Sequence, residues 1–145
     1  MAVTVVNPPP TYEKISDKDG NITSAWLQFF DQIYNGDQGS EWTPTAVSLG
    51  QTGTPTITGL IYKISKKLVY FRILIVPATN TSSVAGTTYF TGLPVTPIAD
   101  GFCTAQAANL GDPTGMVVAS SNRIYSPTWT NIAVNVTVSG VIEAS

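Results

Sequence analysis

Two neighbouring apolar runs, residues 54–65 and 66–77, constrain the fold of this chain most strongly. Each has the length of a strand, and a polar turn near Ser65–Lys67 separates them, which predicts a β-hairpin. In the second run, alternation divides the side chains into two sets, with Val69, Phe71, Ile73 and Ile75 on one face and Leu68, Tyr70, Arg72 and Leu74 on the other. Because both sets are largely apolar, we predict a central strand that is covered on both faces.

Glycine and proline divide the rest of the C-terminal part into short segments. Strands are predicted within residues 87–94 and 100–109, and two more within 115–129 around a turn at Ser121–Asn122. Residues 78–87 are expected to form a loop. The final segment, 131–145, is predicted as one half-buried strand with Ile132, Val134, Val136 and Val138 on its inner face. About eight strands at this spacing indicate an all-β, antiparallel sandwich.

The N-terminal part has a different character. Three consecutive prolines, Pro8, Pro9 and Pro10, predict an extended, polyproline-like arm over residues 1–13, lying on a surface or in a groove. Residues 16–21 predict a turn with Gly20 in a left-handed conformation. A short amphipathic helix is expected over residues 23–35, capped by Thr23 or Ser24 and ended by Gly36. Its apolar stripe consists of Trp26, Phe29, Phe30 and Ile33.

Residues 36–45 are rich in turn formers and are predicted as a linker. The chain therefore divides into an arm with its helix, residues 1–41, and a β-domain, residues 42–145. The first part has six acidic and two basic side chains, and the second has three acidic and five basic ones. Only 11% of all residues are charged, against roughly 25% in an average soluble domain. A surface with so few charges is consistent with cover by other subunits.

The sequence lacks the residues that most enzyme mechanisms need. It has no histidine and a single cysteine, Cys103, so a Ser–His–Asp triad and a zinc site of Cys and His are both excluded. We therefore expect no enzymatic activity, no cofactor and no metal, and Cys103 is expected to be a small buried apolar side chain. Net charge is −2, which does not favour nucleic-acid binding.

Two groups of side chains are candidates for surface contacts. Lys63, Lys66 and Lys67, with Arg72, form the basic cluster; we interpret it as a solvated hairpin turn, with an interface ion pair or a weak contact to anionic sugars as the alternatives. The longest apolar stretch is too short to span a membrane and contains Arg72, and the first ten residues show no secretory pattern. The remaining aromatic side chains are interpreted as core or subunit contacts, with a carbohydrate platform as the alternative: Trp42, Tyr62, Tyr70, Phe71, Tyr89, Phe90, Tyr125 and Trp129.

Three quoted stretches together carry a resemblance across essentially the whole chain: "PPPTYEKISDKDGNITSAWLQFFDQIYNGDQGSEWTPT", "ITGLIYKISKKLVYFRILIVPATNTSSVAGTTYFTGLP" and "RIYSPTW…VSGVIEAS". The pattern resembles small virion structural proteins of tailed bacteriophages, described as tail fibres, spikes or minor structural proteins. In such fibres an N-terminal segment anchors the protein to the particle, and a C-terminal β-knob, commonly a trimeric jelly roll, faces outward.

The resemblance implies a virion protein, assembled in the host cytoplasm, that is a homotrimer and binds other phage structural proteins. It implies that the helix stripe Trp26, Phe29, Phe30 and Ile33 belongs to an anchor or a three-helix stalk, and we expect Pro8–Pro10 and Tyr12 to belong to the same interface. Contact with a host surface glycan is a further expectation. Two alternatives stay open: a capsid decoration protein and a carbohydrate-binding β-sandwich module. Packing of the helix on its own domain also stays open.

Overall fold

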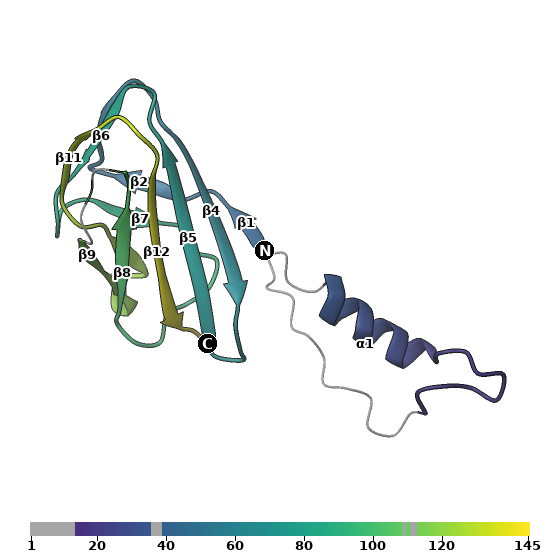
Figure 1. Cartoon of the computed structure of the whole chain (residues 1–145). Helices are drawn as coiled ribbons and strands as arrows, with labels where there is room; N and C mark the ends of the chain where they lie inside the picture. Colours follow the sequence, from purple (N-terminus) through teal and green to yellow (C-terminus); the bar gives the residue numbers. More distant parts are fainter. Residues whose placement is uncertain (1–13, 36–38, 109, 111–112) are drawn as a thin grey trace.

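The computed structural model describes residues 14–35, 39–108, 110 and 113–145, and these form two antiparallel sheets and one α-helix (Figure 1). The larger sheet has nine strands in the order β1 (Ser40–Trp42), β4 (Thr56–Lys63), β5 (Leu68–Val76), β12 (Val136–Glu143), β8 (Gly101–Gln106), β9 (Thr114–Val118), β10 (Arg123–Tyr125), β7 (Tyr89–Thr91) and β2 (Thr45–Val47). The smaller sheet has three, in the order β11 (Trp129–Ile132), β6 (Asn80–Ser83) and β3 (Gly50–Thr52). The predicted all-β, antiparallel, sandwich-like fold is confirmed.

The core lies on the inner face of the curled nine-stranded sheet. Strand β5 pairs with β4 on one side and with β12 on the other, each over eight residue pairs, so the three longest strands lie side by side. Their inward side chains are aliphatic or aromatic and have no solvent exposure at Ile61, Phe71 and Val138. Phe90 from β7 and Ile124 from β10 close the other side of the same core. Burial of this apolar surface is the main stabilising term of the fold.

The predicted hairpin is confirmed, but one of its expected properties is wrong. Strands β4 and β5 are joined by a turn in which the Ser65 hydroxyl accepts hydrogen bonds from the backbone N–H groups of Lys67 and Leu68, at 3.4 and 3.2 Å. Strand β5 is central, as predicted, but only its inner face is covered. Among the described residues, nothing buries the outer set, and Leu68 and Arg72 are exposed. Because the side chains on both faces of β5 are largely apolar, both faces were predicted to be buried, but no part of the described chain buries the outer face.

The C-terminal segment is not the single strand that its alternation predicts. Asn131 adopts a positive φ of 50°, which asparagine tolerates better than most residues. The pairing of β11 with β6 is irregular between Trp129 and Ile132, and Val134 is exposed on the connection to β12. The chain thus leaves the small sheet and joins the large one within the stretch that was predicted to be continuous. Only the part from Val136 onward alternates as expected.

Strand β6 lies within the predicted loop 78–87, and a hydroxyl network explains it. Thr81 and Ser83 point into the interior, where polar groups need partners. The indole N–H of Trp129 donates to the Thr81 hydroxyl at 3.2 Å, and the Ser83 and Ser126 hydroxyls are 2.6 Å apart. Ser126 in turn donates to the Thr88 carbonyl at 3.3 Å. A polar sequence therefore forms a buried strand here, because hydrogen bonds attach the small sheet to the large one.

Two further strands fall within or beside the predicted linker 36–45. Strand β1 pairs with β4 through Trp42 and Gly59, where the indole lies directly against the glycine backbone. Strand β2 pairs with β7 at the opposite edge of the large sheet. Serine, glutamate and threonine at these positions give no apolar alternation, so only pairing with longer strands makes them regular. Strands β7, β8 and β10 lie within the residues predicted for them, and β9 begins one residue earlier, at Thr114. Asn122 has the left-handed conformation of a turn residue between β9 and β10.

The predicted helix is confirmed as α1 (Ser24–Asn35), preceded by the predicted turn. Gly20 has a φ of +82°, and the Asp17 carboxylate accepts hydrogen bonds from the backbone N–H groups of Asp19 and Asn21, at 2.8 and 2.9 Å. The bond from Asn21, more than that from Asp19, lowers the pKa of Asp17. The Thr23 hydroxyl, predicted as a cap acceptor, instead donates to the Lys14 carbonyl at 2.7 Å. The residue predicted to end the helix, Gly36, lies outside the described residues.

Figure 1 shows α1 beyond β1, apart from both sheets. Its N-terminal end points away from the β-domain, and its C-terminal end points toward the domain. Within the described ranges, no helix has the length and apolar character needed to cross a membrane.

Candidate functional site

A single row of apolar and aromatic side chains crosses the outer face of the large sheet. Register pairs join Tyr62 to Tyr70 and Tyr70 to Val141 across the three longest strands. Gly140 pairs with Cys103, so the next residues along, Val141 and Phe102, continue the row. From there, register pairs lead through β9, β10 and β7 to β2. We call these eight residues the outer row: Tyr62, Tyr70, Val141, Phe102, Met116, Tyr125, Tyr89 and Val47.

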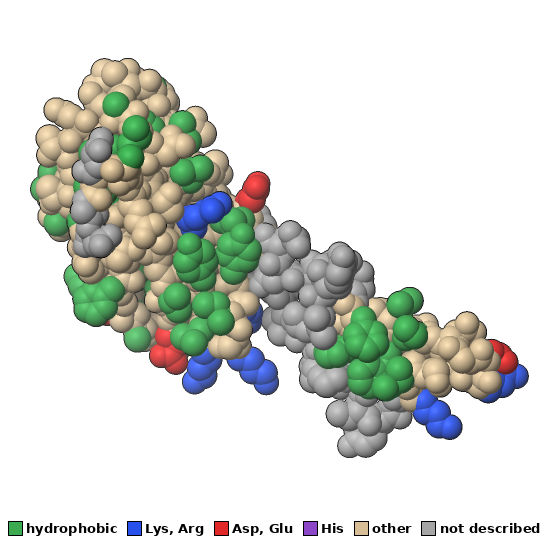
Figure 2. Space-filling model, in the orientation of Figure 1, with side chains coloured by type: hydrophobic (Ala, Val, Ile, Leu, Met, Phe, Trp, Pro, Cys, Tyr) green, Lys and Arg blue, Asp and Glu red, His purple; other side chains and the backbone are tan. Residues whose placement is uncertain are grey.

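The outer row is largely accessible in the single chain. Phe102 has a relative exposure of 75%, Val141 of 48% and Met116 of 45%, and the others are half-buried. Figure 2 shows hydrophobic side chains gathered on the face of the sheet turned to the viewer. A single exposed apolar residue needs no explanation, but a connected series of this length is typical of a surface that contacts something else.

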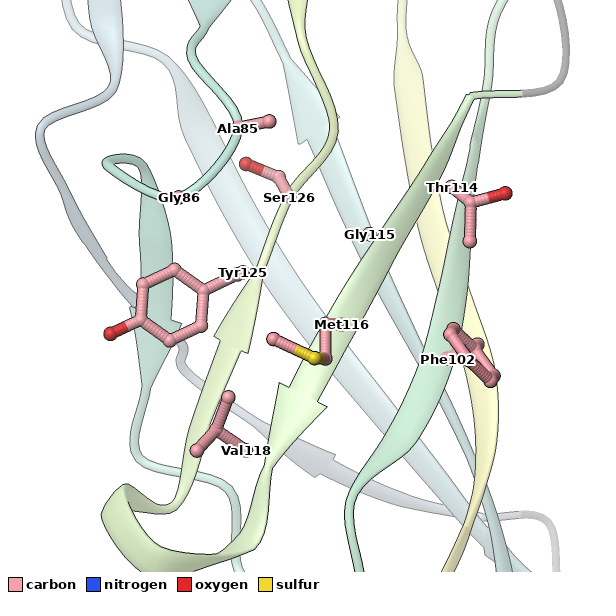
Figure 3. A pocket seen from close by; sticks show the side chains of 9 residues that line it. All are labelled: Ala85, Gly86, Phe102, Thr114, Gly115, Met116, Val118, Tyr125 and Ser126. Carbon is pink, nitrogen blue, oxygen red and sulfur yellow. The ribbon is translucent and has the colours of Figure 1, made fainter.

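The outer row widens into a groove at β8, β9 and β10. The groove has a volume of about 550 Å³ and is closed on one side by the loop that follows β6. Its lining is mostly apolar and consists of Ala85, Gly86, Phe102, Thr114, Gly115, Met116, Val118, Tyr125 and Ser126. Figure 3 shows the Met116 side chain lying between Phe102 on one side and Tyr125 on the other. This volume falls within the range of known ligand sites, roughly 300–1,000 Å³.

The floor of the groove depends on a glycine. A Cβ atom at Gly115 would collide with the backbone carbonyl oxygen of Tyr125 and would come within 2.8 Å of Cys103 Sγ. The Cys103 thiol lies beneath, buried as predicted, and its sulfur donates to the Tyr125 carbonyl at 3.5 Å. Burial raises the pKa of the Cys103 thiol to about 12, so it remains protonated and unreactive at neutral pH.

A charged side chain, Arg123, lies next to Tyr125, which lines the groove. The Tyr89 and Tyr125 rings lie with their centroids 5.3 Å apart, and the Arg123 guanidinium lies 4.3 Å from the Tyr89 centroid. Arg123 also donates to the Tyr125 hydroxyl at 3.3 Å, and this bond is the main reason that the pKa of Arg123 is raised. A permanently positive, planar group thus flanks two aromatic rings, an arrangement suited to an acidic or aromatic ligand.

The residues predicted for the anchor are only partly within the described chain. Pro8–Pro10 and Tyr12 lie outside the described residues, as does the side chain of Ile33. The rings of Trp26, Phe29 and Phe30 form one cluster on α1, with centroids 5.6 to 5.8 Å apart, and Phe30 is 41% exposed. Their clustering on one side of the helix agrees with the predicted stripe.

The basic cluster is spread over one end of the β4–β5 hairpin. Lys66 and Lys67 are exposed in the turn, and Lys63 is half-buried at the end of β4. Arg72 lies on the outer face, opposite Leu60 and Ser139 in the neighbouring strands. Their role in a surface contact stays a prediction.

The eight aromatic residues predicted to be core or subunit contacts, or else a carbohydrate platform, divide evenly between the two faces. Trp42, Phe71, Phe90 and Trp129 are buried, whereas Tyr62, Tyr70, Tyr89 and Tyr125 belong to the outer row. Sequence reasoning missed the other four members of the row, which are Phe102, Met116, Val141 and Val47. For Phe102 a signal was present: it alternates with the small buried residues Cys103 and Ala105, which marks it as the outward residue of its strand.

Residues 14–35, 39–108, 110 and 113–145 contain no group of three or more Cys, Asp or Glu side chains that could hold a metal ion. The Asp100 carboxylate accepts a hydrogen bond from the backbone N–H of Ala119 at 2.8 Å, which fixes the turn before β10.

No family model, curated protein or solved structure matches the chain.

Proposed function

We propose that this chain is a non-enzymatic structural protein of a bacteriophage particle, a short trimeric fibre or spike attached through residues 1–41. The outer row is the observation that carries the proposal. Eight connected side chains on one sheet face, several of them exposed in the single chain, are what a subunit contact requires. The sequence resemblance supplies the phage context, and by analogy with known knobs we assign the β-domain to the jelly-roll class.

The composition and the separate helix support the same assignment. Only 11% of the residues are charged, which leaves little repulsion between copies. Helix α1 carries a cluster of three aromatic rings and lies apart from the β-domain in Figure 1. A helix of 12 residues is marginal when isolated, so packing against another subunit or a virion protein would stabilise it.

The test is to measure the mass of the purified full-length chain and to locate it on the particle. Sedimentation velocity at micromolar concentration should show a trimer. Antibody labelling of phage particles that carry the gene should mark one vertex or the tail. Label spread over the whole capsid would instead favour a decoration protein, and a monomer that is absent from particles would contradict the proposal.

A carbohydrate-binding module is the second candidate, and the paired tyrosines favour it. Tyr89 and Tyr125 lie beside Arg123, Tyr125 also lines the groove, and half-exposed aromatic rings can stack on sugar faces. A glycan array separates the candidates. Binding that is lost in Tyr125→Ala, in a chain that remains monomeric, would support the module and contradict the fibre.

A further inference from the structure

In the groove between the loop after β6 and strands β8 to β10, the polar groups of Tyr125 and Ser126 already have hydrogen-bond partners. The Ser126 hydroxyl bonds to Ser83 and to the Thr88 carbonyl. The carbonyl oxygen of Tyr125 accepts from Cys103, and its hydroxyl accepts from Arg123. If a ligand rich in N–H or O–H donors bound here, its donors would be buried against carbon atoms without acceptors, which costs free energy.

A proline-rich segment avoids this cost. Proline has no backbone N–H, so three in a row bring carbonyl groups and apolar rings but no donors into the groove. Such segments are also rigid before binding and dock between aromatic side chains in known recognition domains. Phe102 and Tyr125 flank the groove, with Met116 between them, and supply that kind of surface (Figure 3).

The chain itself contains one run of this kind, Pro8–Pro10. Glu13 follows Pro10 by three residues, which is about 9 Å in a polyproline helix. Arg123 donates to the hydroxyl of Tyr125, which lines the groove, so an acidic residue just beyond the prolines complements its charge. The whole N-terminal part is acidic and the β-domain is basic, so the same complementarity extends beyond the groove.

The position of α1 decides which copy supplies the arm. In Figure 1, α1 lies beyond β1, whereas β8 and β9 lie across the β-domain from it. The Lys14 carbonyl accepts from Thr23, so residue 14 lies at the end of α1 that points away from the domain. Pro10 and Pro8 precede it by four and six residues, a reach of at most about 20 Å, and α1 alone, with 12 residues, is about 18 Å long. Pro8–Pro10 therefore cannot pass the helix and cross the sheet to β8 and β9 of the same chain, so the groove must belong to a second copy.

We propose that the Pro8–Pro10 arm of one copy binds the groove formed by Phe102, Met116 and Tyr125 of a second copy. The inference rests on the proposed homo-oligomeric function and names the contact that links the subunits. It makes the contact heterologous, since one surface supplies the arm and another the groove. Repetition of such a contact closes a ring where the rotation between neighbouring copies is one third of a turn, as in the proposed trimer.

The test uses two full-length variants and a mixture of them. In the arm variant, Pro8, Pro9 and Pro10 are replaced by alanine. The groove variant carries Phe102→Glu and Met116→Glu at two exposed positions, so the fold should persist and the circular dichroism spectrum should not change. We expect each variant alone to associate at least tenfold more weakly than the wild type in sedimentation velocity. Val134→Glu, also exposed but outside the groove, is the matched control and should assemble normally.

Mixing the two variants decides whether the contact lies between copies. One intact arm and one intact groove remain in each mixed pair, so a 1:1 heterodimer should form. Oligomers of wild-type mass in both variants would overturn the inference and leave the fibre proposal standing. Monomeric variants that form no heterodimer would also overturn it, since the arm would then bind within its own chain or not at all.

A labelled peptide of residues 2–13 tests the groove even if the wild-type chain is monomeric, an outcome that by itself contradicts only the oligomer. Fluorescence anisotropy with the arm variant should show at least tenfold tighter binding of this peptide than of a peptide with the three prolines replaced by alanine. Equal binding of the two peptides, or no binding of either, would overturn the inference.

Discussion

The two faces of the nine-stranded sheet are both largely apolar, but in the single chain the inner face is buried and the outer face is accessible to solvent. The inner face, with Phe71 and Ile73 from β5, has no solvent exposure. The outer face of the same strand carries Tyr70 and Arg72, and the outer row continues from there to Phe102, which is 75% exposed. Inner residues are mainly aliphatic or phenylalanine, and outer ones include four tyrosines.

The difference in residue type follows from the difference in surroundings. Close packing of an interior favours side chains without polar atoms. A tyrosine can bury its ring against a partner and keep its hydroxyl in water when no partner is bound, which suits a surface that exists in two states. The comparison therefore separates residues that hold the domain together from residues available to hold copies together.

The largest expected effect is a difference in unfolding free energy between two single substitutions, one of a phenylalanine on the inner face and one of a phenylalanine on the outer face. Phe71→Ala should lower the free energy of unfolding by about 3–5 kcal/mol, because it leaves a cavity in a fully buried site. Phe102→Ala should change it by less than about 0.5 kcal/mol, as is usual for an exposed residue. Urea unfolding in the background of the arm variant removes any contribution from assembly. Similar losses for the two substitutions would break the distinction between the faces.

A smaller effect is expected from the buried Cys103 thiol beneath the groove, which should make the stability of the fold depend on pH. The pKa of Cys103 is raised by burial to about 12 from an ordinary value of 9.0, so the folded state binds a proton that the unfolded state releases. Its contribution to stability is complete below pH 9 and is lost as the pH rises toward 12, with a slope of at most about 1.4 kcal/mol per pH unit. The difference in unfolding free energy between wild type and Cys103→Ala, measured by urea titration, should therefore shrink above pH 9. A difference independent of pH would show that the thiol is not isolated from water.

The smallest effect lies on the outer face. A double-mutant cycle with Arg123→Leu and Tyr89→Leu should give a small favourable coupling, because this cation–π pair lies on the surface of the sheet. Thermal unfolding at low and high salt provides the measurement. A coupling as large as the loss expected for Phe71→Ala would mean that the cluster is desolvated, and the outer face would then not be a free surface at this end.

Local pattern alone determined the hairpin 54–77, the helix with its preceding turn, the burial of Cys103 and the all-β class. In each of these the relevant information lies within a few neighbouring residues: alternation, a turn former, a helical stripe or a small apolar side chain. The arm with Pro8–Pro10 lies outside the described residues and stays a prediction, which rests on the backbone angle that proline fixes whatever surrounds it.

Tertiary structure decided the rest. Thr81 and Ser83 form a buried strand only because Trp129 and Ser126 supply hydrogen bonds from 48 and 43 residues away. The segment from residue 131 divides between two sheets because each half has its own partner strand. The outer row exists only through the register of eight strands, and no stretch of sequence contains more than one or two of its members. Alternation states that a side chain lies on one face or the other, but which face the chain itself covers depends on how the whole sheet curls.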